Sequence, residues 1–228
     1  MIRQTLFRGE DPYRGLSVDQ SLVDMEGWGS DHPLLTYAID QLRPPLIIEV
    51  GSWKGRSAIN MAKCLKVLGI PGEILCIDTW LGSPEHWMLD SWYQSLKVTN
   101  GRPTIYHTFI NNVMANNCSD IITPVSLTSD GAYYLLKNLE VTAKLIYIDA
   151  GHEYESVKND IEHYWEILDP KGVMILDDYL GWPGVTRAVN EFGVKNDIHP
   201  YGEPGKAVLS KDSQFLITTK LMAITQAP

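Results

Sequence analysis

The chain has 228 residues, of which 44% are hydrophobic and 21% are charged, and its formal net charge at pH 7 is -9. This length is typical of one globular α/β domain that needs no disulfide or metal to hold its core, so we expect a single domain over residues 1–228. The negative charge argues against nucleic acid and anionic membranes as partners, because both need clustered Lys and Arg. A small neutral or cationic substrate is favoured instead.

Cysteine usage and the N-terminal sequence indicate a reducing compartment. Cys64, Cys76 and Cys118 are widely spaced and form no Cys-x-x-Cys pair, so neither a disulfide framework nor a structural zinc site is predicted. The first eight residues lack the apolar run of a signal peptide, and no stretch is apolar enough to span a bilayer. We therefore expect a cytoplasmic protein.

Residues 1–44 are interpreted as an N-terminal cap followed by a helix. The helix is expected to start at residues 30–33, where a proline occupies an early helical position, and residues 35–42 then show a helical apolar stripe. Tyr13 and Trp28 in the preceding stretch are compatible with a lid over a ligand and with a subunit interface. The sequence leaves both interpretations open.

Five short apolar runs follow, and each leads into Gly, Asp or Ser. They are residues 46–50, 74–77, 121–125, 145–148 and 173–176. Runs that are apolar throughout are typical of parallel strands covered on both faces, and stripes of helical periodicity at residues 58–65 and 157–168 predict the crossover helices. Residues 83–119 separate the second and third runs by more than one helix needs, which predicts a substrate-side insertion.

The C-terminal part is predicted to end the sheet with an antiparallel edge. Apolar runs at residues 207–209 and 215–218 flank a short polar segment, a pattern that indicates a hairpin. The predicted fold is therefore α/β and Rossmann-like. It has a doubly wound, mostly parallel seven-stranded sheet with an antiparallel C-terminal strand, and helices on both faces.

The turn after the first strand carries a glycine motif. Residues 49–55 read Glu-Val-Gly-Ser-Trp-Lys-Gly, and Gly51 and Gly55 allow the backbone to approach a ligand beside a helix N-terminus. The spacing differs from the Gly-x-Gly-x-x-Gly of dinucleotide sites, and with Glu49 in the strand and Ser52 in the turn it favours S-adenosylmethionine (SAM). A tight turn without a ligand is the structural alternative.

Other strand ends complete the predicted cofactor site. Asp78 ends the second strand, where a carboxylate can accept hydrogen bonds from both ribose hydroxyls, and Thr79 follows it. Asp78 as a turn or capping residue is the alternative. After the third strand, Ser126 and Thr128 are expected near the adenine, although such residues are common in loops. Asp149, at the end of the fourth strand, is assigned to the same site.

Three carboxylates converge at the ends of the fourth and fifth strands, namely Asp149, Asp177 and Asp178. Adjacent strands lie about 5 Å apart, so these side chains can share one cation. Oxygen ligands suit a hard divalent ion, and Mg²⁺ is the first choice, with another divalent cation as the alternative. Without a cation the carboxylates would raise one another's pKa. A metal-free site, in which one Asp binds substrate and the others cap turns, is the structural alternative.

His152 stands three residues after Asp149, close enough to act on a substrate oxygen held at such a cation. Its ordinary pKa of about 6.5 allows it to take a proton near neutral pH, so we predict that it is the general base. A purely structural hydrogen-bonding role is the alternative. His86, His107 and His163 lack this position after a strand.

The segments that carry these residues resemble a known group. Residues 49–57, 77–80, 148–157 and 172–179 are similar to class I SAM-dependent methyltransferases related to macrolide-sugar O-methyltransferases and cephalosporin-hydroxylase-type proteins. The similarity spans roughly residues 45–190. It implies a Rossmann-like fold, SAM as the cofactor and methyl transfer as the reaction.

More distantly, the placement of Asp149, Asp177 and Asp178 is similar to the metal site of catechol O-methyltransferases, which usually have Asn as the third ligand and Lys at the position of His152. The resemblance implies that the three aspartates bind metal and that His152 is the base. The group commonly reads Asp-Gly-Asp-His where this chain reads Asp-Ala-Gly-His, so a carboxylate is lost at Gly151.

Together these features predict a SAM-dependent and magnesium-dependent O-methyltransferase that acts on a hydroxyl of a small molecule, either a sugar or a catechol-like compound with vicinal oxygens. An NAD-dependent oxidoreductase is the first alternative, since Asp78 would suit an NAD ribose equally. A nonenzymatic SAM-binding domain is the second, and assembly into a homo-oligomer is left open. Aromatic residues that follow strand ends are candidates to stack on the acceptor: Trp80, Trp87, Trp92, Tyr93, Tyr179 and Trp182.

Overall fold

The apolar runs of the sequence form the strands of one sheet. A computed structural model describes residues 2–212 and residue 215, and its strands are β1 (Leu46–Val50), β2 (Glu73–Asp78), β3 (Ile122–Ser126), β4 (Ala143–Ile148), β5 (Leu168–Tyr179), β6 (Tyr201–Glu203) and β7 (Gly205–Ser210). Their order is β3-β2-β1-β4-β5-β7-β6. Strands β1 to β5 run parallel, and β7 is antiparallel to β5 and β6. The predicted seven-stranded Rossmann-like sheet with an antiparallel C-terminal strand is confirmed.

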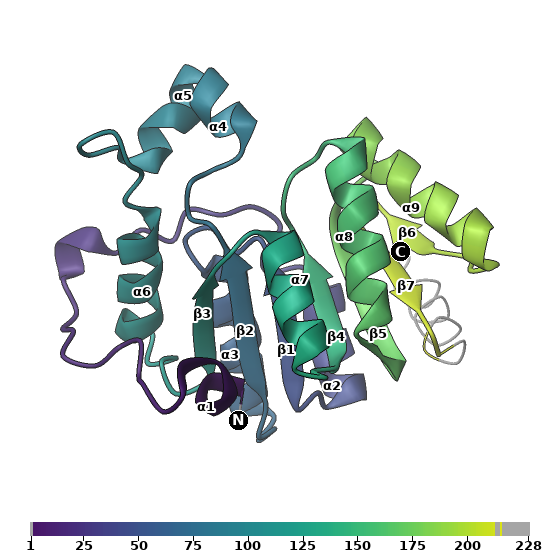
Figure 1. Cartoon of the computed structure of the whole chain (residues 1–228), viewed down its shortest axis with the longest axis horizontal. Helices are drawn as coiled ribbons and strands as arrows, with labels where there is room; N and C mark the ends of the chain where they lie inside the picture. The colour runs from purple at the N-terminus through teal and green to yellow at the C-terminus, as the bar shows by residue number, and fades with distance from the viewer. Residues whose placement is uncertain (1, 213–214, 216–228) are drawn as a thin grey trace, which may run out of the picture.

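Helices cover both faces of the sheet (Figure 1). One layer holds α2 (Pro33–Leu42), α3 (Arg56–Val67) and α6 (Ile105–Ala115); the other holds α1 (Ile2–Phe7), α7 (Ser129–Asn138), α8 (Tyr154–Glu166) and α9 (Pro183–Asn196). Along β4, Leu145 and Tyr147 join the first core while Ile146 and Ile148 join the second. This alternation explains why the strand is apolar throughout, because both of its faces are buried.

Two predicted element bounds are wrong. Leu168, expected on a helix, opens β5 because α8 already ends at Glu166. Residues 207–209 do form a strand, but its hairpin partner is β6, and Gly205, the first residue of β7, has a φ of 91° that glycine tolerates. The expected partner run, residues 215–218, lies outside the described residues except for Phe215, whose ring centroid is 5.7 Å from that of Tyr37.

Two segments extend over the carboxyl ends of the parallel strands. Within the predicted insertion, the short helices α4 (Pro84–Met88), α5 (Asp90–Tyr93) and η2 (Gln94–Leu96) stand above this edge, whereas α6 packs on the sheet (Figure 1). The N-terminal segment passes through η1 (Gln20–Leu22) alongside α6 and then crosses to α2. We call residues 24–30 of this segment the strap.

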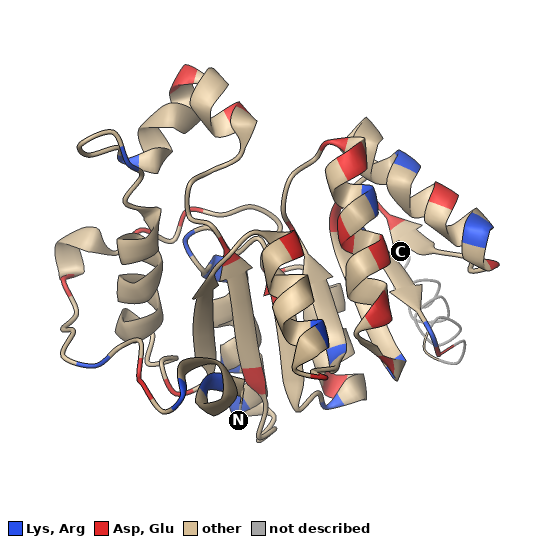
Figure 2. Cartoon of the chain, viewed as in Figure 1, with Lys and Arg blue, Asp and Glu red and all other residues tan. Residues whose placement is uncertain are grey.

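Charged residues of both signs are interspersed on the helices in view in Figure 2, without the stripe of Lys and Arg that a nucleic-acid-binding face needs. Across the described part of the chain, no helix combines the length and the apolar character that crossing a membrane requires.

The turn between β1 and α3 depends on Gly51. Its φ is 84°, and a Cβ at this position would lie 1.9 Å from the carbonyl oxygen of Asp149. Its N–H donates to the carbonyl oxygen of Ile77 at 2.8 Å. The ends of β1, β2 and β4 therefore meet at a point where a side chain has no room.

Glu49 supports this turn from below. It is fully buried, and its carboxylate accepts hydrogen bonds from the hydroxyls of Ser52 and Ser57, each at 2.6 Å. Burial raises the pKa of Glu49 to about 6, although the two hydroxyl donors oppose this shift. The acidic residue that the sequence places in the strand thus ties the turn to the start of α3.

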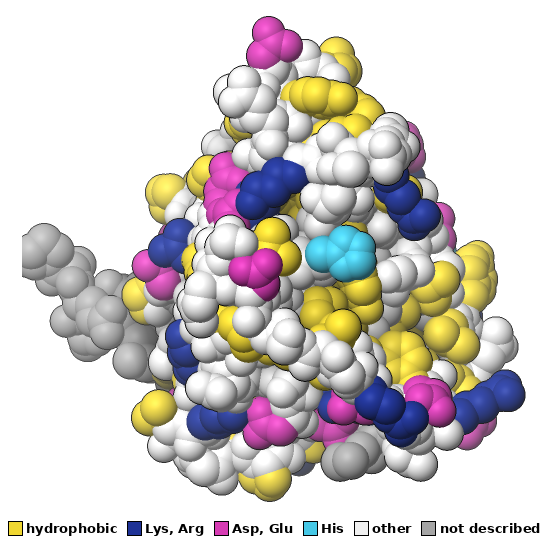
Figure 3. All heavy atoms as spheres, turned by 90° about the vertical axis from the view of Figure 1, so that its left-hand side faces the viewer, with side chains coloured by type: hydrophobic (Ala, Val, Ile, Leu, Met, Phe, Trp, Pro, Cys, Tyr) yellow, Lys and Arg dark blue, Asp and Glu magenta, His cyan; other side chains and the backbone are white. Residues whose placement is uncertain are grey.

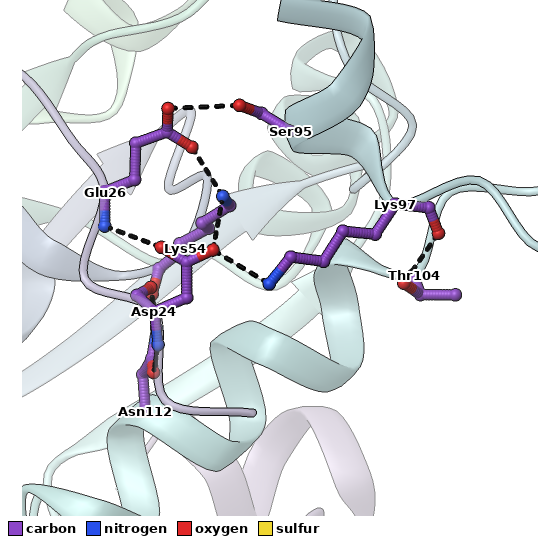
Figure 4. A network of polar contacts seen from close by, with 7 residues as sticks. All are labelled: Asp24, Glu26, Lys54, Ser95, Lys97, Thr104 and Asn112. Carbon is purple, nitrogen blue, oxygen red and sulfur yellow. Dashed lines mark hydrogen bonds and ion pairs between the residues drawn. The ribbon is translucent and has the colours of Figure 1, made fainter. Parts of the chain in front are cut away.

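Lys54, in the same turn, fastens the strap to the sheet (Figure 4). Its side chain is 1% exposed, and its ammonium donates to Asp24 at 2.8 Å and to Glu26 at 2.5 Å. Lys97 reaches Asp24 from the insertion at 2.9 Å, and Ser95 donates to Glu26 at 3.0 Å. Burial would raise the pKa of Asp24, but the hydrogen bonds from both lysines outweigh it and lower the pKa to about 2.

Asn112 of α6 closes the network on the backbone. Its amide donates to the carbonyl oxygens of Asp24 and Lys54 at 2.7 and 2.8 Å, and its side-chain oxygen accepts from the Asp24 N–H at 3.0 Å. The strap, the β1 turn, the insertion and α6 are thereby joined around one buried ammonium.

Replacing Gly51 by alanine should destabilise the protein far more than the same change at Gly69. Both glycines have a positive φ, but a Cβ at Gly69 meets nothing within 4 Å. Gly69→Ala should lower the free energy of unfolding by about 1–2 kcal/mol from backbone strain alone. Gly51→Ala adds a collision with the β4 backbone and should exceed about 4 kcal/mol. Urea unfolding of the two variants measures the difference, and equal losses would contradict this account.

Replacing Lys54 by methionine should release the strap. The change leaves Glu26 without a cation and removes one of the two that contact Asp24. We expect it to cost roughly 2–3 kcal/mol in urea unfolding and to speed Glu-C cleavage at Glu26. Lys97→Met is the matched control, because Lys97 contacts the same Asp24 but is 44% exposed. The control should cost less than about 1 kcal/mol. Similar costs and cleavage rates for both variants would show that the strap does not depend on Lys54.

Candidate functional site

A cavity of about 850 Å³ opens where the parallel strands end. This volume lies in the range of small-molecule sites. Its wall is formed by the strap, the turns after β1 to β5, residues of α4 and α5, and the beginning of β7. The segments predicted from sequence to follow strand ends therefore do share one site.

Asp78 organises the part of this cavity beside the β1 turn. Its Oδ2 accepts the backbone N–H groups of Ser52 and Trp53 at 2.9 and 2.8 Å, and its Oδ1 accepts that of Trp80 at 2.7 Å. Burial raises the pKa of Asp78, and these three donors oppose the shift. The carboxylate both holds the β1 turn and lines the cavity. Other predicted cofactor residues on the same wall are Gly51, Ser52, Thr79, Thr128 and Asp149.

Three predicted cofactor residues lie off the wall. Glu49 is beneath the turn, as described above. Gly55 is the N-cap of α3, and a Cβ there would meet the Phe109 ring at 2.9 Å, so this glycine serves helix packing. Ser126 ends β3 with an exposed side chain, and the wall is formed instead by residues 127–129 that follow it.

His152 faces the same cavity from the end of β4. Its Nε2 lies 3.0 Å from Oδ2 of Asp178, and its ring is stacked on Trp182 with centroids 4.1 Å apart. Burial disfavours the protonated ring, but the hydrogen bond and charge of Asp178 outweigh it, so the pKa of His152 is raised. Its Nδ1 has no hydrogen-bond partner and lies 3.6 Å from Oε1 of Glu85, too far for a hydrogen bond.

Asp149 and Asp177 share one hydrogen-bond donor, the Tyr147 hydroxyl. The hydroxyl of Tyr147 is 2.6 Å from Oδ2 of Asp177 and 3.1 Å from Oδ2 of Asp149. Oδ1 of Asp177 forms a buried ion pair with Lys206 of β7. Burial raises the pKa of Asp149 well above its ordinary value, and the charges of Asp177 and Asp178 add to this shift.

These contacts do not fit a divalent cation held by the three aspartates. Asp177 is engaged by Lys206 and Tyr147, and Asp178 by His152. Within residues 2–212 and 215, no group of three or more His, Cys, Asp and Glu side chains is arranged to hold a metal ion. The metal stays a prediction from sequence, and these contacts do not support it.

Aromatic side chains form the mouth of the cavity. Of the candidates named from sequence, Trp92 and Trp182 are on the wall. Trp80 is buried in the core, whereas Trp87 and Tyr93 are 45% and 41% exposed on the insertion, whose side of the molecule shows apolar atoms at its surface (Figure 3). Tyr179 also lies off the wall. Trp28 of the strap does line the cavity, and its ring centroid lies 6.0 Å from that of Trp92. This position supports the lid interpretation of the segment.

Several wall residues escaped sequence reasoning. His86 follows no strand, yet α4 brings its ring to 4.3 Å from that of Trp53 on the wall. The buried atoms Ser30 Oγ, Trp53 Nε1, His86 Nε2 and His152 Nδ1 all lack a hydrogen-bond partner, and all four residues line the cavity. Buried polar atoms are normally paired, so this concentration points to a polar ligand.

Comparison with known proteins agrees with this geometry. Residues 48–179, more than half of the chain, match a family described as a methyltransferase domain. Two uncharacterized curated proteins also match. One from Sinorhizobium fredii is 26% identical over 66% of this chain and 15% of its own length. One from Acanthamoeba polyphaga mimivirus is 24% identical over 63% of this chain and 57% of its own length. The chain thus spans only part of both relatives.

Solved structures show the same fold. A calicheamicin methyltransferase has a TM-score of 0.57 and 22% identity, over 78% of this chain and 76% of that one. An O-methyltransferase from Bacillus cereus in complex with S-adenosylhomocysteine (SAH) has a TM-score of 0.57 and 13% identity, over 83% and 84%. The O-methyltransferase TomG from Streptomyces achromogenes, in complex with SAM, has a TM-score of 0.55 and 13% identity, over 86% and 92%.

The family match disfavours the NAD-dependent oxidoreductase that the sequence had left as an alternative. The β1 turn, the Asp78 carboxylate and the cavity above them are placed as the sequence predicted for a SAM site. This chain therefore belongs to the family described as a methyltransferase domain.

Proposed function

We propose that this enzyme transfers the methyl group of SAM to a hydroxyl of a small molecule, with His152 as the general base. The observation that carries the proposal is the His152–Asp178 pair, which lies on the same cavity wall as the Gly51 turn and Asp78. A base and a cofactor site that open into one cavity are what O-methylation needs.

The imidazole is oriented for this role from two sides. Asp178 binds Nε2, and Trp182 stacks on the ring, so Nδ1 is the nitrogen left to take a proton. A carboxylate that fixes the tautomer and orientation of a catalytic histidine is a recurrent arrangement. An acceptor hydroxyl that reaches Nδ1 takes the place of the Glu85 carboxylate, which now lies beside it.

In the reaction, the acceptor oxygen forms a bond to the methyl carbon as its proton passes to His152. The carbon–sulfur bond breaks, and its electron pair stays on sulfur, so the sulfonium becomes neutral SAH. The protein contributes chiefly by holding the oxygen, methyl and sulfur in line. Deprotonation by His152 makes the oxygen nucleophilic at the moment of attack.

The cavity favours a neutral or cationic acceptor with a ring. The carboxylates of Glu85 and Asp178 lie beside His152, and Asp149 lines the same cavity. Trp28 and Trp92 offer flat aromatic surfaces on the wall. Aromatic faces bind both sugar and phenol rings. One solved neighbour is titled a TDP-rhamnose 3'-O-methyltransferase, which supports testing glycosides alongside catechols.

Replacing His152 by alanine should separate binding from chemistry. We expect SAH affinity within about twofold of the wild type but a loss of at least about 100-fold in SAH release with a panel of glycosides and catechols. His107→Ala is the control, because His107 is exposed on α6. A protein that binds SAM and turns over none of these acceptors would favour the nonenzymatic alternative. Undiminished turnover by the variant would remove His152 from the mechanism.

The pH dependence of kcat/KM should show the effect of Asp178 on the pKa of His152. Only neutral His152 can act as the base, so activity is lost as the pH falls through its pKa, which Asp178 raises above the ordinary value. Asp178→Asn should move the acid limb of kcat/KM to lower pH and reduce the plateau rate. Asparagine suits this position because residue 178 has a φ of 62°, which Asn adopts readily. An unchanged acid limb would contradict the pairing.

A further inference from the structure

The cluster of aspartates at the ends of β4 and β5 already includes a cationic side chain, that of Lys206. Lys206 lies on β7 in direct register with Asp177 of β5, and the side chains of both are buried, at 1% and 9% exposure. The ammonium of Lys206 pairs with Oδ1 of Asp177 and lies 5.5 Å from the centre of the Tyr147 ring. A fully buried lysine is rare unless a partner offsets its charge.

The remaining acceptor positions of Asp177 are also engaged. Its Oδ1 accepts the backbone N–H of Asp178 at 2.8 Å, and its Oδ2 accepts the Tyr147 hydroxyl at 2.6 Å. That hydroxyl also lies 3.1 Å from Asp149. Contacts therefore run without a break from Lys206 through Asp177 and Tyr147 to Asp149, and Asp178 has His152 as a separate partner.

The strap covers this ion pair. A Cβ at Gly29 would lie 2.9 Å from Nζ of Lys206 and 3.2 Å from Oδ2 of Asp177. The backbone of Gly29 is thus packed directly over both groups. A magnesium ion demands octahedral oxygen geometry, whereas both oxygens of Asp177 are already engaged by Lys206, the Tyr147 hydroxyl and the Asp178 N–H.

We propose that Lys206 is the resident cation of this site, so that the aspartates bind no divalent metal and methyl transfer proceeds without one. Lys206 is a positioning residue, because it holds Asp177 and, through Tyr147, Asp149. His152 accepts the proton of the acceptor hydroxyl, and Asp178 orients the His152 ring. The catalytic part of this inference rests on the proposed function, but the exclusion of metal does not.

Manganese binding tests the proposal without any acceptor. Mn²⁺ shares the preference of Mg²⁺ for oxygen ligands and is detected by electron paramagnetic resonance. The wild type should bind no Mn²⁺ more tightly than about 1 mM, with or without SAH, whereas a structural Mg²⁺-type site would be far tighter. A stoichiometric Mn²⁺ site in the wild type that is lost in Asp149→Asn would overturn the proposal, and this arm needs no Lys206 variant to fold.

Lys206→Met supplies the converse experiment. Removing the ammonium leaves Asp149 and Asp177 with uncompensated charge, so Mn²⁺ affinity should rise by at least roughly tenfold. SAH binding, measured in EDTA, identifies folded protein. A lysine with a merely structural role would leave metal affinity unmoved, and that result in folded protein would count against the proposal.

The two proposals fail separately. Wild-type protein that excludes Mn²⁺ but transfers no methyl group would retain Lys206 as the resident cation and reject the proposed function. Turnover that is stimulated by Mg²⁺ and abolished by EDTA would confirm methyl transfer and reject the role of Lys206.

Discussion

A carboxylate that leaves water must be given a cation or a hydrogen-bond donor, and the candidate site of this chain is built around that requirement. At the carboxyl edge of the sheet, Glu49 is buried, Asp78 and Asp149 are half-buried, and Asp177 is buried. Side-chain hydroxyls donate to Glu49, backbone N–H groups donate to Asp78, and the Tyr147 hydroxyl donates to Asp149 and Asp177. These donors come from the β1 turn, α3, the turn after β2 and β4, so satisfying the acids also holds these segments together.

Two buried lysines also donate to carboxylates, and they connect segments that are far apart in the sequence. Lys54 reaches outward from the β1 turn to the strap, and Lys206 reaches inward from the last strand to β5. Lys54 ties the strap to the β1 turn, and Lys206 holds Asp177 at the end of β5. Because breaking a buried ion pair leaves an uncompensated charge, both contacts favour one arrangement over neighbouring ones.

Much of the fold could be predicted because parallel strands buried on both faces leave a strong apolar signal, and the turns after them are short. For the same reason Asp78, Asp149, His152, Asp177 and Asp178 could be placed on one edge. Contacts between distant segments carry no such signal. Lys206 lies in β7, for which the sequence predicts residues 215–218 as the hairpin partner, whereas the partner is β6. The residues around Lys206 in the sequence therefore do not reveal its pairing with Asp177 of β5.

Spacing also could not separate residues that face the ligand from residues that support them. Glu49 and Gly55 belong to the glycine motif, yet one holds the turn from below and the other makes room for Phe109. His86 shows the converse, because only the fold of the insertion brings it to the wall. Clustered acids likewise suggest a metal from sequence alone, since the sequence does not show which basic side chain is folded in among them.

The strap is held at both ends, by Lys54 near Asp24 and by the close packing of Gly29 on Lys206. Between these points it forms part of the cavity wall. Opening the cavity on this side means lifting a backbone segment that is anchored twice, not turning a single side chain. Exchange of a bound molecule through this side of the cavity would then follow the slower timescale of segment motions, not that of side-chain rotation.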